Sequence, residues 1–240
     1  MERTIMFPDR ELHYQHEVKN VKNINIRIRS DLTVYVSSNP QTALAEVEKV
    51  LLEKQAYICL ALDRYAEMRK YAAHEHEYVS GESFRFLGRD LRLKVSLGGQ
   101  NRVDTDGIYL FLTVKEDNDT LKKRLIKQWY SQMREQEIGA ICRETYRCFE
   151  KYHVEYPQIR FRNMVSRWGS CQPKRKVVTL NRRLIEMPKI CIEYVVLHEF
   201  VHFLQPDHSK RFYGLMTMFM PDWKARAQLL EKEGVFGIEV

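Results

Sequence analysis

The segment from Pro188 to Gln205 constrains the fold most, because it is apolar on nearly every side yet carries two histidines and a glutamate. Its apolar residues are Ile190, Ile192, Val195, Val196, Leu197, Phe200, Val201, Phe203 and Leu204. Such a pattern predicts a helix that is buried on most sides, and Pro188 suits its first turn. His198 and His202 are four residues apart, so they lie on the same face of that helix. These polar side chains on a buried helix therefore indicate a functional site.

The polar residues of this helix have the spacing of a metal site. His198, Glu199 and His202 form an H-E-x-x-H motif, in which two imidazoles bind one ion and the carboxylate reaches a metal-bound water. Pro206 ends the helix, so the chain can fold back and offer His208 as a third ligand. Three imidazoles leave the fourth position of a zinc ion open, as in catalytic sites. A hydrogen-bonded structural cluster is the alternative, but burying these groups without a metal would be costly.

Further motifs spread over most of the chain resemble those of one enzyme family. They are Arg167-Trp168-Gly169-Ser170-Cys171, Thr179-Leu180-Asn181, the HEFVH of residues 198–202, Asp207–Tyr213 and Met220-Pro221-Asp222, with Asn25–Arg29 and Val79–Arg89 nearer the N-terminus. They look like the motifs of the YgjP-like metallopeptidases, which are relatives of the SprT-like zinc proteases. The resemblance implies a zinc-dependent hydrolase, with peptide hydrolysis as the expected reaction. Zinc would lower the pKa of a bound water toward about 7, and Glu199 would then pass the water's proton to the leaving amine.

Two positions depart from the family's pattern. Phe200 stands where members commonly have a smaller aliphatic residue, and Gln205-Pro206-Asp207 stand where an asparagine often precedes the third histidine. Neither departure removes a ligand. Both bear on the shape of the cleft beside the metal.

The segment before the metal helix supplies the candidate substrate-binding residues, which are Arg167, Trp168, Gly169, Ser170 and Tyr213. The resemblance implies that a strand next to the metal binds the substrate backbone in an extended form. Other roles remain open for three of them. Trp168 could belong to the core, Gly169 could serve a bulge, and Tyr213 could either face developing charge or simply pack.

Periodicity along the chain predicts an α+β fold in two parts. We expect an N-terminal antiparallel sheet with one long helix at residues 1–116, the helix starting at Asn39 and running to about Tyr71. A polar connector is expected at residues 74–77. We expect a helical zincin-like catalytic part with a small antiparallel sheet at residues 117–240, because composition becomes polar around residues 116–119.

Composition points to a cytoplasmic protein. No run of 18 apolar residues exists, and the first 15 residues are charged where a signal peptide would be apolar, so no membrane is expected as a partner. Five cysteines are scattered without C-x-x-C pairing, which indicates reduced thiols. Cys171 lies near the expected site, and a packed thiol is favoured over a nucleophile there.

The net charge of +7 leaves room for an anionic partner. One local concentration of positive charge lies close to the expected chemistry, at Arg167, Lys174, Arg175, Lys176, Arg182 and Arg183. It could meet an acidic substrate, a nucleotide or nucleic acid, or be a generic basic surface.

The sequence as a whole leaves three functional hypotheses. They are a metallopeptidase acting on a protein or peptide, a nucleoside triphosphate hydrolase at the same metal, and a nucleic-acid-associated protein of the SprT-like kind.

Overall fold

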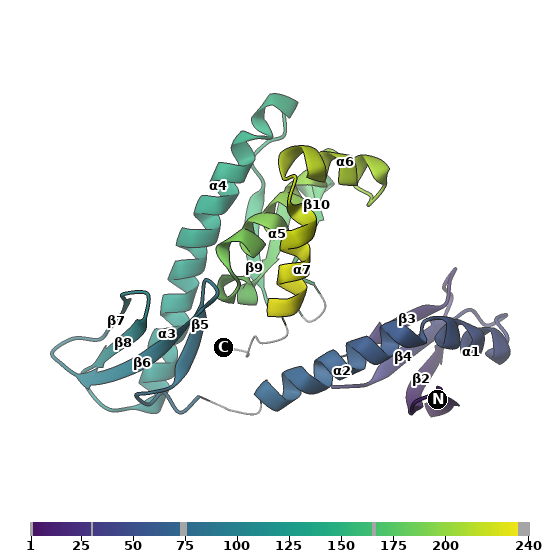
Figure 1. Cartoon of the computed structure of the whole chain (residues 1–240), viewed down its shortest axis with the longest axis horizontal. Helices are drawn as coiled ribbons and strands as arrows, with labels where there is room; N and C mark the ends of the chain where they lie inside the picture. The colour runs from purple at the N-terminus through teal and green to yellow at the C-terminus, as the bar shows by residue number, and fades with distance from the viewer. Residues whose placement is uncertain (1, 30, 73–75, 165–166, 235–240) are drawn as a thin grey trace. The chain divides into compact units, whose positions relative to one another are not determined.

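The computed structural model, which describes residues 2–29, 31–72, 76–164 and 167–234, confirms the α+β class (Figure 1). The chain forms two compact units, Met1–Ala73 and His74–Val240. The predicted boundary at 116/117 does not coincide with this division, because the strands before residue 116 share a hydrophobic core with the helices that follow them. The expected polar connector at residues 74–77 lies partly outside the described residues.

The first unit contains a mixed four-stranded sheet. Its strands are β1 (Glu2–Met6), β2 (Glu11–Val18), β3 (Asn25–Ile28) and β4 (Val34–Ser38), in the order β1-β2-β4-β3. The predicted hairpin of β3 and β4 is present, but β2 and β4 are parallel, so the sheet is not purely antiparallel as expected. The reason is that β3 takes the outer position in the sheet, so β4 lies between β3 and β2 and pairs with β2 in parallel.

The helical segment of the first unit starts later than predicted. Helices α1 (Leu44–Glu53) and α2 (Gln55–Ala72) replace the single helix expected from Asn39. The Asn39 side chain instead accepts a hydrogen bond from the Gln41 backbone N–H at 3.0 Å, which forms a local turn. Val47 and Leu51 of α1 are buried in the core of this unit.

The second unit begins with a sheet of the same topology. Its strands are β5 (Ser83–Phe86), β6 (Arg89–Leu97), β7 (Arg102–Thr105) and β8 (Tyr109–Val114), in the order β5-β6-β8-β7. The parallel pair is again central, between β6 and β8, and the outer pairs are antiparallel. A helical segment follows each sheet, so the chain builds one strand-and-helix motif twice.

Equivalent residues support this internal repeat. Leu12 and Tyr14 are buried in β2 as Leu91 and Leu93 are buried in β6. The sequence repeats weakly at the first turn of each sheet, as Phe7-x-x-Arg10-Glu11-Leu12 and Phe86-x-x-Arg89-Asp90-Leu91. A match this short is not noticeable without the strand pairing.

The C-terminal half of the second unit contains the third sheet and most of the helices. They are α3 (Asp119–Met133), a π-helical turn (Arg134–Ile138), α4 (Gly139–Arg147), β9 (Gln158–Arg162), β10 (Gly169–Gln172), β11 (Val177–Asn181), a 3₁₀ turn (Arg182–Glu186), α5 (Lys189–Val201), α6 (Lys210–Phe219) and α7 (Trp223–Glu233). The segment from α3 to α4 forms one long helix (Figure 1). Its cap is Asn118, one of three candidates that the sequence offers at residues 117–119, and the Asn118 side chain accepts a hydrogen bond from the Leu121 backbone N–H at 2.9 Å.

The third sheet has the order β10-β11-β9. It is mixed where an antiparallel sheet was expected, because β9 runs parallel to β11 and only β10 is antiparallel. Both β10 and β9 are outer strands. Within the described residues, no helix is long and apolar enough to cross a membrane.

The β5–β6 turn fixes the start of the metal helix. Leu87 and Gly88 donate backbone hydrogen bonds to the carbonyls of Ile185 and Glu186 at 2.9 and 3.0 Å. Gly88 has a φ of +81°, and a Cβ at this position would lie 2.8 Å from the Cγ of Pro188. The second sheet is therefore held against the residues that lead directly into α5.

Candidate metal centre

Helix α5 places the H-E-x-x-H residues at the centre of the second unit. It packs against α4, α6, α7 and the strands β10 and β11. Its apolar residues are buried on several sides, as the sequence predicts, and Glu199 is only 5 % exposed. His198 and His202 are partly buried.

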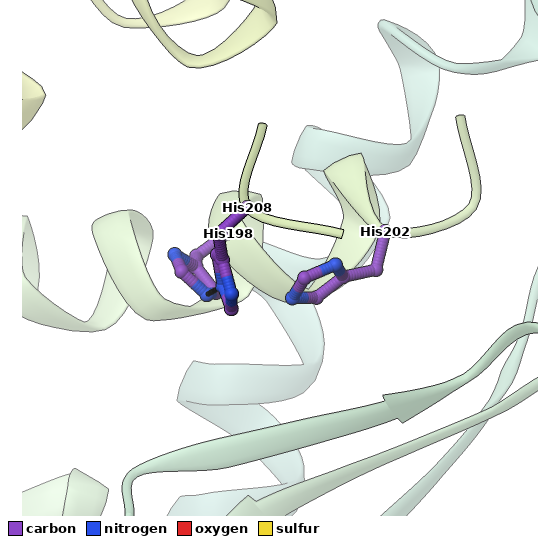
Figure 2. Close-up of side chains that lie close together, drawn as sticks. All are labelled: His198, His202 and His208. Carbon is purple, nitrogen blue, oxygen red and sulfur yellow. Dashed lines mark hydrogen bonds between the residues drawn. The ribbon is translucent and has the colours of Figure 1, made fainter. Parts of the chain in front are cut away.

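Three imidazoles converge at the end of this helix (Figure 2). The Nε2 atoms of His198 and His208 are 3.0 Å apart, and the ring centroids of the three histidines are 4.8 to 5.1 Å from one another. Zinc–nitrogen distances of about 2.0–2.1 Å in a tetrahedral site would separate the ligand nitrogens by about 3.3 Å. The arrangement therefore fits one zinc ion.

A short loop turns His208 back toward α5. Helix α5 ends at Val201, earlier than the end at Pro206 that the sequence predicts, and Pro206 lies in the loop that follows. The Asp207 carboxylate accepts hydrogen bonds from the Gln205 side chain at 2.7 Å and the Ser209 backbone N–H at 3.2 Å. These contacts stabilise the loop that presents the third histidine.

The surroundings favour neutral, metal-binding imidazoles. His202 Nδ1 lies 3.2 Å from the Gln205 carbonyl oxygen. Because a carbonyl only accepts, Nδ1 carries the hydrogen and the Nε2 lone pair remains for a metal. Burial, with smaller contributions from the other two histidines, lowers the pKa of His198 to about 4. His198 is therefore neutral at pH 7.

Phe212 forms an apolar wall behind all three histidines. Its ring centroid lies 4.9, 4.8 and 4.7 Å from those of His198, His202 and His208. The side chain is fully buried. The sequence pattern favours Phe212 as a core residue over a residue of a specificity pocket. Its place four residues after His208, on the first turn of α6, is the one signal that it also shapes the metal centre.

Glu199 lies against the backbone of β10. Burial raises the pKa of its carboxyl to about 8, and the charge of Arg167 opposes this shift. A Cβ added to Gly169 would lie 2.6 Å from Glu199 Oε1, so only glycine leaves room for the carboxyl here. Both readings of Gly169 from the sequence missed this contact. The other edge of β10 is unpaired within the described residues.

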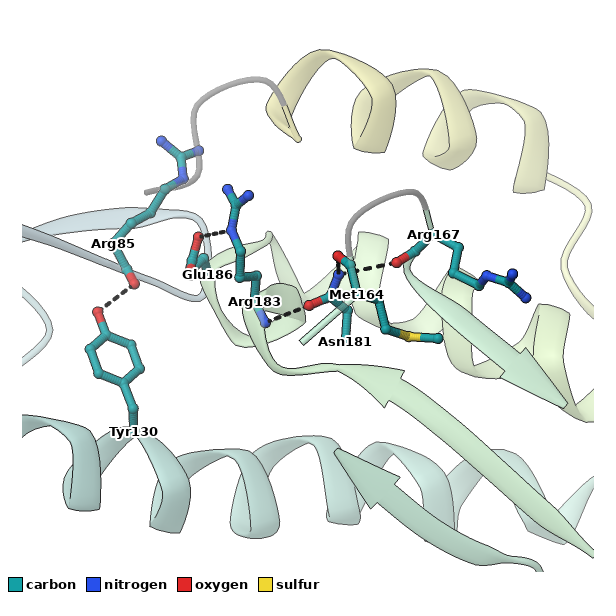
Figure 3. A network of polar contacts seen from close by, with 7 residues as sticks. All are labelled: Arg85, Tyr130, Met164, Arg167, Asn181, Arg183 and Glu186. Carbon is teal, nitrogen blue, oxygen red and sulfur yellow. Dashed lines mark hydrogen bonds and ion pairs between the residues drawn. The ribbon is translucent and has the colours of Figure 1, made fainter. Parts of the chain in front are cut away.

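Asn181 holds the segment that leads into β10. Its side-chain amide donates to the carbonyls of Met164 at 2.8 Å and Arg167 at 3.0 Å (Figure 3). Its backbone N–H donates to the Trp168 carbonyl at 2.8 Å. The sequence offers Asn181 only as part of the Thr179-Leu180-Asn181 motif, without this role.

The other predicted substrate residues lie at different depths around the centre. Arg167 is exposed, Ser170 is partly buried in β10, and Trp168 packs at the margin of the core. Tyr213 is 42 % exposed and stacks between His208, at 6.4 Å, and Trp223, at 5.4 Å. Tyr194, which was not predicted, places its ring 6.0 Å from that of His198.

The structure makes Cys171 an unreactive thiol and gives two of the basic residues acidic partners. Burial, followed by the charge of Glu199, raises the pKa of Cys171 to about 12, which keeps it a thiol. All five cysteines are free. Two of the six basic residues have acidic partners, because Arg183 pairs with Glu186 at 3.4 Å and Lys176 with Glu155 at 2.5 Å.

Comparisons with known proteins give one family and one similar solved structure. A family model described as the YgjP-like metallopeptidase domain matches residues 22–233. No curated protein is significantly similar to the chain. A solved structure, the metallopeptidase zymogen jannalysin of Methanocaldococcus jannaschii, matches with 20% identity and a TM-score of 0.36, over 40% of this chain and 89% of that chain. Because the family model spans most of the sequence, the chain belongs to the YgjP-like metallopeptidase family.

Proposed function

We propose that the protein is a zinc-dependent peptidase in which His198, His202 and His208 hold one zinc ion and Glu199 is the general base. The observation that carries the proposal is the convergence of three imidazoles beside a buried carboxyl. Family membership supports hydrolysis of a protein or peptide.

The residues of the centre have distinct tasks in this reaction. When bound, zinc would supply a Lewis acid that polarises the scissile carbonyl and acidifies the attacking water. Bound zinc would also favour the ionised form of the nearby Glu199 carboxyl, whose pKa burial raises in the metal-free protein. The Glu199 carboxylate would then accept a proton from the attacking water and return it to the leaving nitrogen. Gly169 leaves the space that this carboxylate occupies, and Phe212 excludes water from the rear of the imidazoles.

Strand β10 is the proposed binding surface for the substrate backbone. It is an outer strand, and Gly169 at its start contacts Glu199. An extended peptide that pairs with such an edge places its carbonyls along the strand, next to the metal. The stacked rings of Tyr213 and Trp223 lie beside His208 and offer an apolar contact for a substrate side chain.

Hydrolysis of an unfolded protein by zinc-loaded wild type and Glu199→Gln tests the proposal. Gln has the size of Glu but accepts no proton, so we expect zinc to stay bound while the rate falls by about 10²–10⁴-fold. Glu144→Gln is the matched control, because Glu144 is exposed and pairs only with Arg147 on the surface. Retained turnover in Glu199→Gln would refute the mechanism.

The same variants separate the peptidase from the nucleotide hypothesis. Nucleoside triphosphates are incubated with wild type and Glu199→Gln under the conditions of the peptidase assay. We expect no Glu199-dependent consumption of triphosphate. Glu199-dependent loss of triphosphate with no cleavage of the unfolded protein would contradict the proposed substrate class.

A further inference from the structure

A cavity of about 350 Å³ lies in the second unit between the α3–α4 helix and the outer strand β9. Four arginines line it, namely Arg134, Arg160, Arg162 and Arg182. Strands β9 and β10 are at opposite edges of the third sheet, so this cavity is separate from the metal centre. Neither the proposed reaction nor the family motifs give these arginines a role.

The protein balances the positive charge of the cavity only in part, through the charges of Glu186 and Glu135 near Arg134. Glu135 is the single carboxylate in its lining. Among the described residues, Arg134, Arg162 and Arg182 have no ion-pair partner, and Arg160 donates to the neutral Gln158 side chain at 2.6 Å. The nearby carboxylate of Glu186 is paired with Arg183 instead (Figure 3).

The fold brings two of these charges together at some cost. Arg134 is partly buried at the start of the π-helical turn, and Arg182 begins the 3₁₀ turn after β11. Burial, followed by the charge of Arg182, lowers the pKa of Arg134. Like charges in such a position are unfavourable unless an anion lies between them. Single π-helical turns are also frequent at functional sites.

We propose that this cavity binds a small ligand that carries two or more negative charges on phosphate groups. Guanidinium groups donate paired hydrogen bonds to phosphate oxygens, and several of them around one cavity suit an ion of high charge. A single carboxylate would neutralise only one of the arginines. The volume is near the lower end of the range of about 300–1,000 Å³ for ligand cavities, which suits a compact ligand.

Calorimetric titration of inorganic pyrophosphate into the zinc-loaded full chain tests the proposal. Arg162 and Arg182 are exposed, so Arg162→Gln and Arg182→Gln leave the fold intact. We expect each variant to bind pyrophosphate at least about tenfold more weakly than wild type. Arg124→Gln is the matched control, because Arg124 is exposed on α3, the helix that precedes Arg134, but does not line the cavity. This variant should bind pyrophosphate as wild type does.

Two further arms exclude other sites and other ligands. Pyrophosphate could bind at the metal instead, so it is also titrated into His208→Ala, where binding should persist. Citrate, a tricarboxylate of similar charge, should bind more weakly than pyrophosphate. Equal affinity of wild type and the Arg162 and Arg182 variants, loss of binding in His208→Ala alone, or tighter binding of citrate would each overturn the proposal.

Discussion

Gly169 shapes the metal centre without contributing any side-chain atom. Its Cα faces the carboxyl of Glu199, and the space that a Cβ would need is already filled by that carboxyl. Asn181 supports the same contact from the other side, because it binds the carbonyls of Met164 and Arg167 just before β10. The position of Glu199, the proposed general base, therefore depends on a glycine and an amide that lie outside the H-E-x-x-H motif.

Gly169→Ala is expected to displace Glu199 while leaving the metal bound. The added methyl would lie 2.6 Å from Oε1, so the carboxyl must move, and a misplacement of about 1 Å can cost about 10²-fold in rate. The loss should appear in kcat for peptide hydrolysis, with zinc content unchanged. Gly99→Ala is the control, because nothing lies within 4 Å of its Cβ position. Unchanged kcat in Gly169→Ala would contradict the role given to this contact.

Glu186 should make the stability of the second unit depend on pH. Burial raises its pKa from 4.5 to about 7, against the opposing charges of Arg183, Arg85 and Arg134. The folded protein therefore holds this proton to a higher pH than the unfolded chain does. Its contribution to stability is complete below about pH 4.5 and is lost as the pH rises toward about 7.

Urea unfolding of metal-free wild type and Glu186→Gln between pH 4.5 and 7 measures this contribution. The free energy of unfolding of wild type, minus that of the variant, should fall by about 3 kcal/mol over this range. The subtraction removes the titration of His198, whose lowered pKa acts in the opposite direction. A difference that stays constant with pH would mean that the arginines keep Glu186 ionised throughout.

At the scale of elements, the sequence predicts local structure well and strand neighbours poorly. Alternation from Ile24 to Val36 predicts the β3–β4 hairpin, and Asn118 correctly marks the start of α3. The parallel pairs β2–β4, β6–β8 and β9–β11 were not predicted, because pairing between non-consecutive strands depends on tertiary packing and not on periodicity.

The same limit applies to the metal centre. The spacing of His198, His202 and His208 can be read directly from the sequence, because two of them share one helical face and the third follows a proline. The contacts of Gly169 with Glu199 and of Phe212 with the imidazoles join segments that are far apart or in different helices. No local pattern encodes them.

The β5–β6 turn is the element that fixes the start of α5, and Gly88 is its critical position. Gly88→Ala should destabilise the protein by about 1–3 kcal/mol through its positive φ, and by more through the contact with Pro188. Gly81→Ala is a matched control, because Gly81 has a φ of +104° but nothing within 4 Å of its Cβ position. Chemical unfolding should give a larger loss for Gly88→Ala. Equal losses would mean that Pro188 moves away from the added methyl group at no cost in the free energy of unfolding.

The whole molecule consists of two units that each have their own hydrophobic core. The first core is built around Tyr14, Val36 and Leu51, and the second extends from Tyr78 to Leu230 and contains the metal helix. The repeated four-stranded motif explains why the division falls at residues 73/74. The first copy forms a unit with α1 and α2, and the second copy packs with the catalytic elements.

Leu51→Ala should weaken the first unit and leave the metal centre unaffected. Leu51 is fully buried, so its truncation should lower the free energy of unfolding of this unit by about 2–5 kcal/mol. Thermal unfolding monitored by calorimetry should show one transition moving to lower temperature while the other stays in place. A parallel fall in zinc affinity would contradict the independence of the two cores.

X-ray absorption at the zinc edge of the purified protein tests the central claim most directly. We expect one zinc ion per chain, with three imidazole nitrogens at about 2.0–2.1 Å and one oxygen ligand. His208→Ala should lose one of the imidazole contributions and most of the bound zinc. A spectrum with sulfur ligands, or a first shell unchanged by replacement of His208, would contradict a centre made by these three histidines.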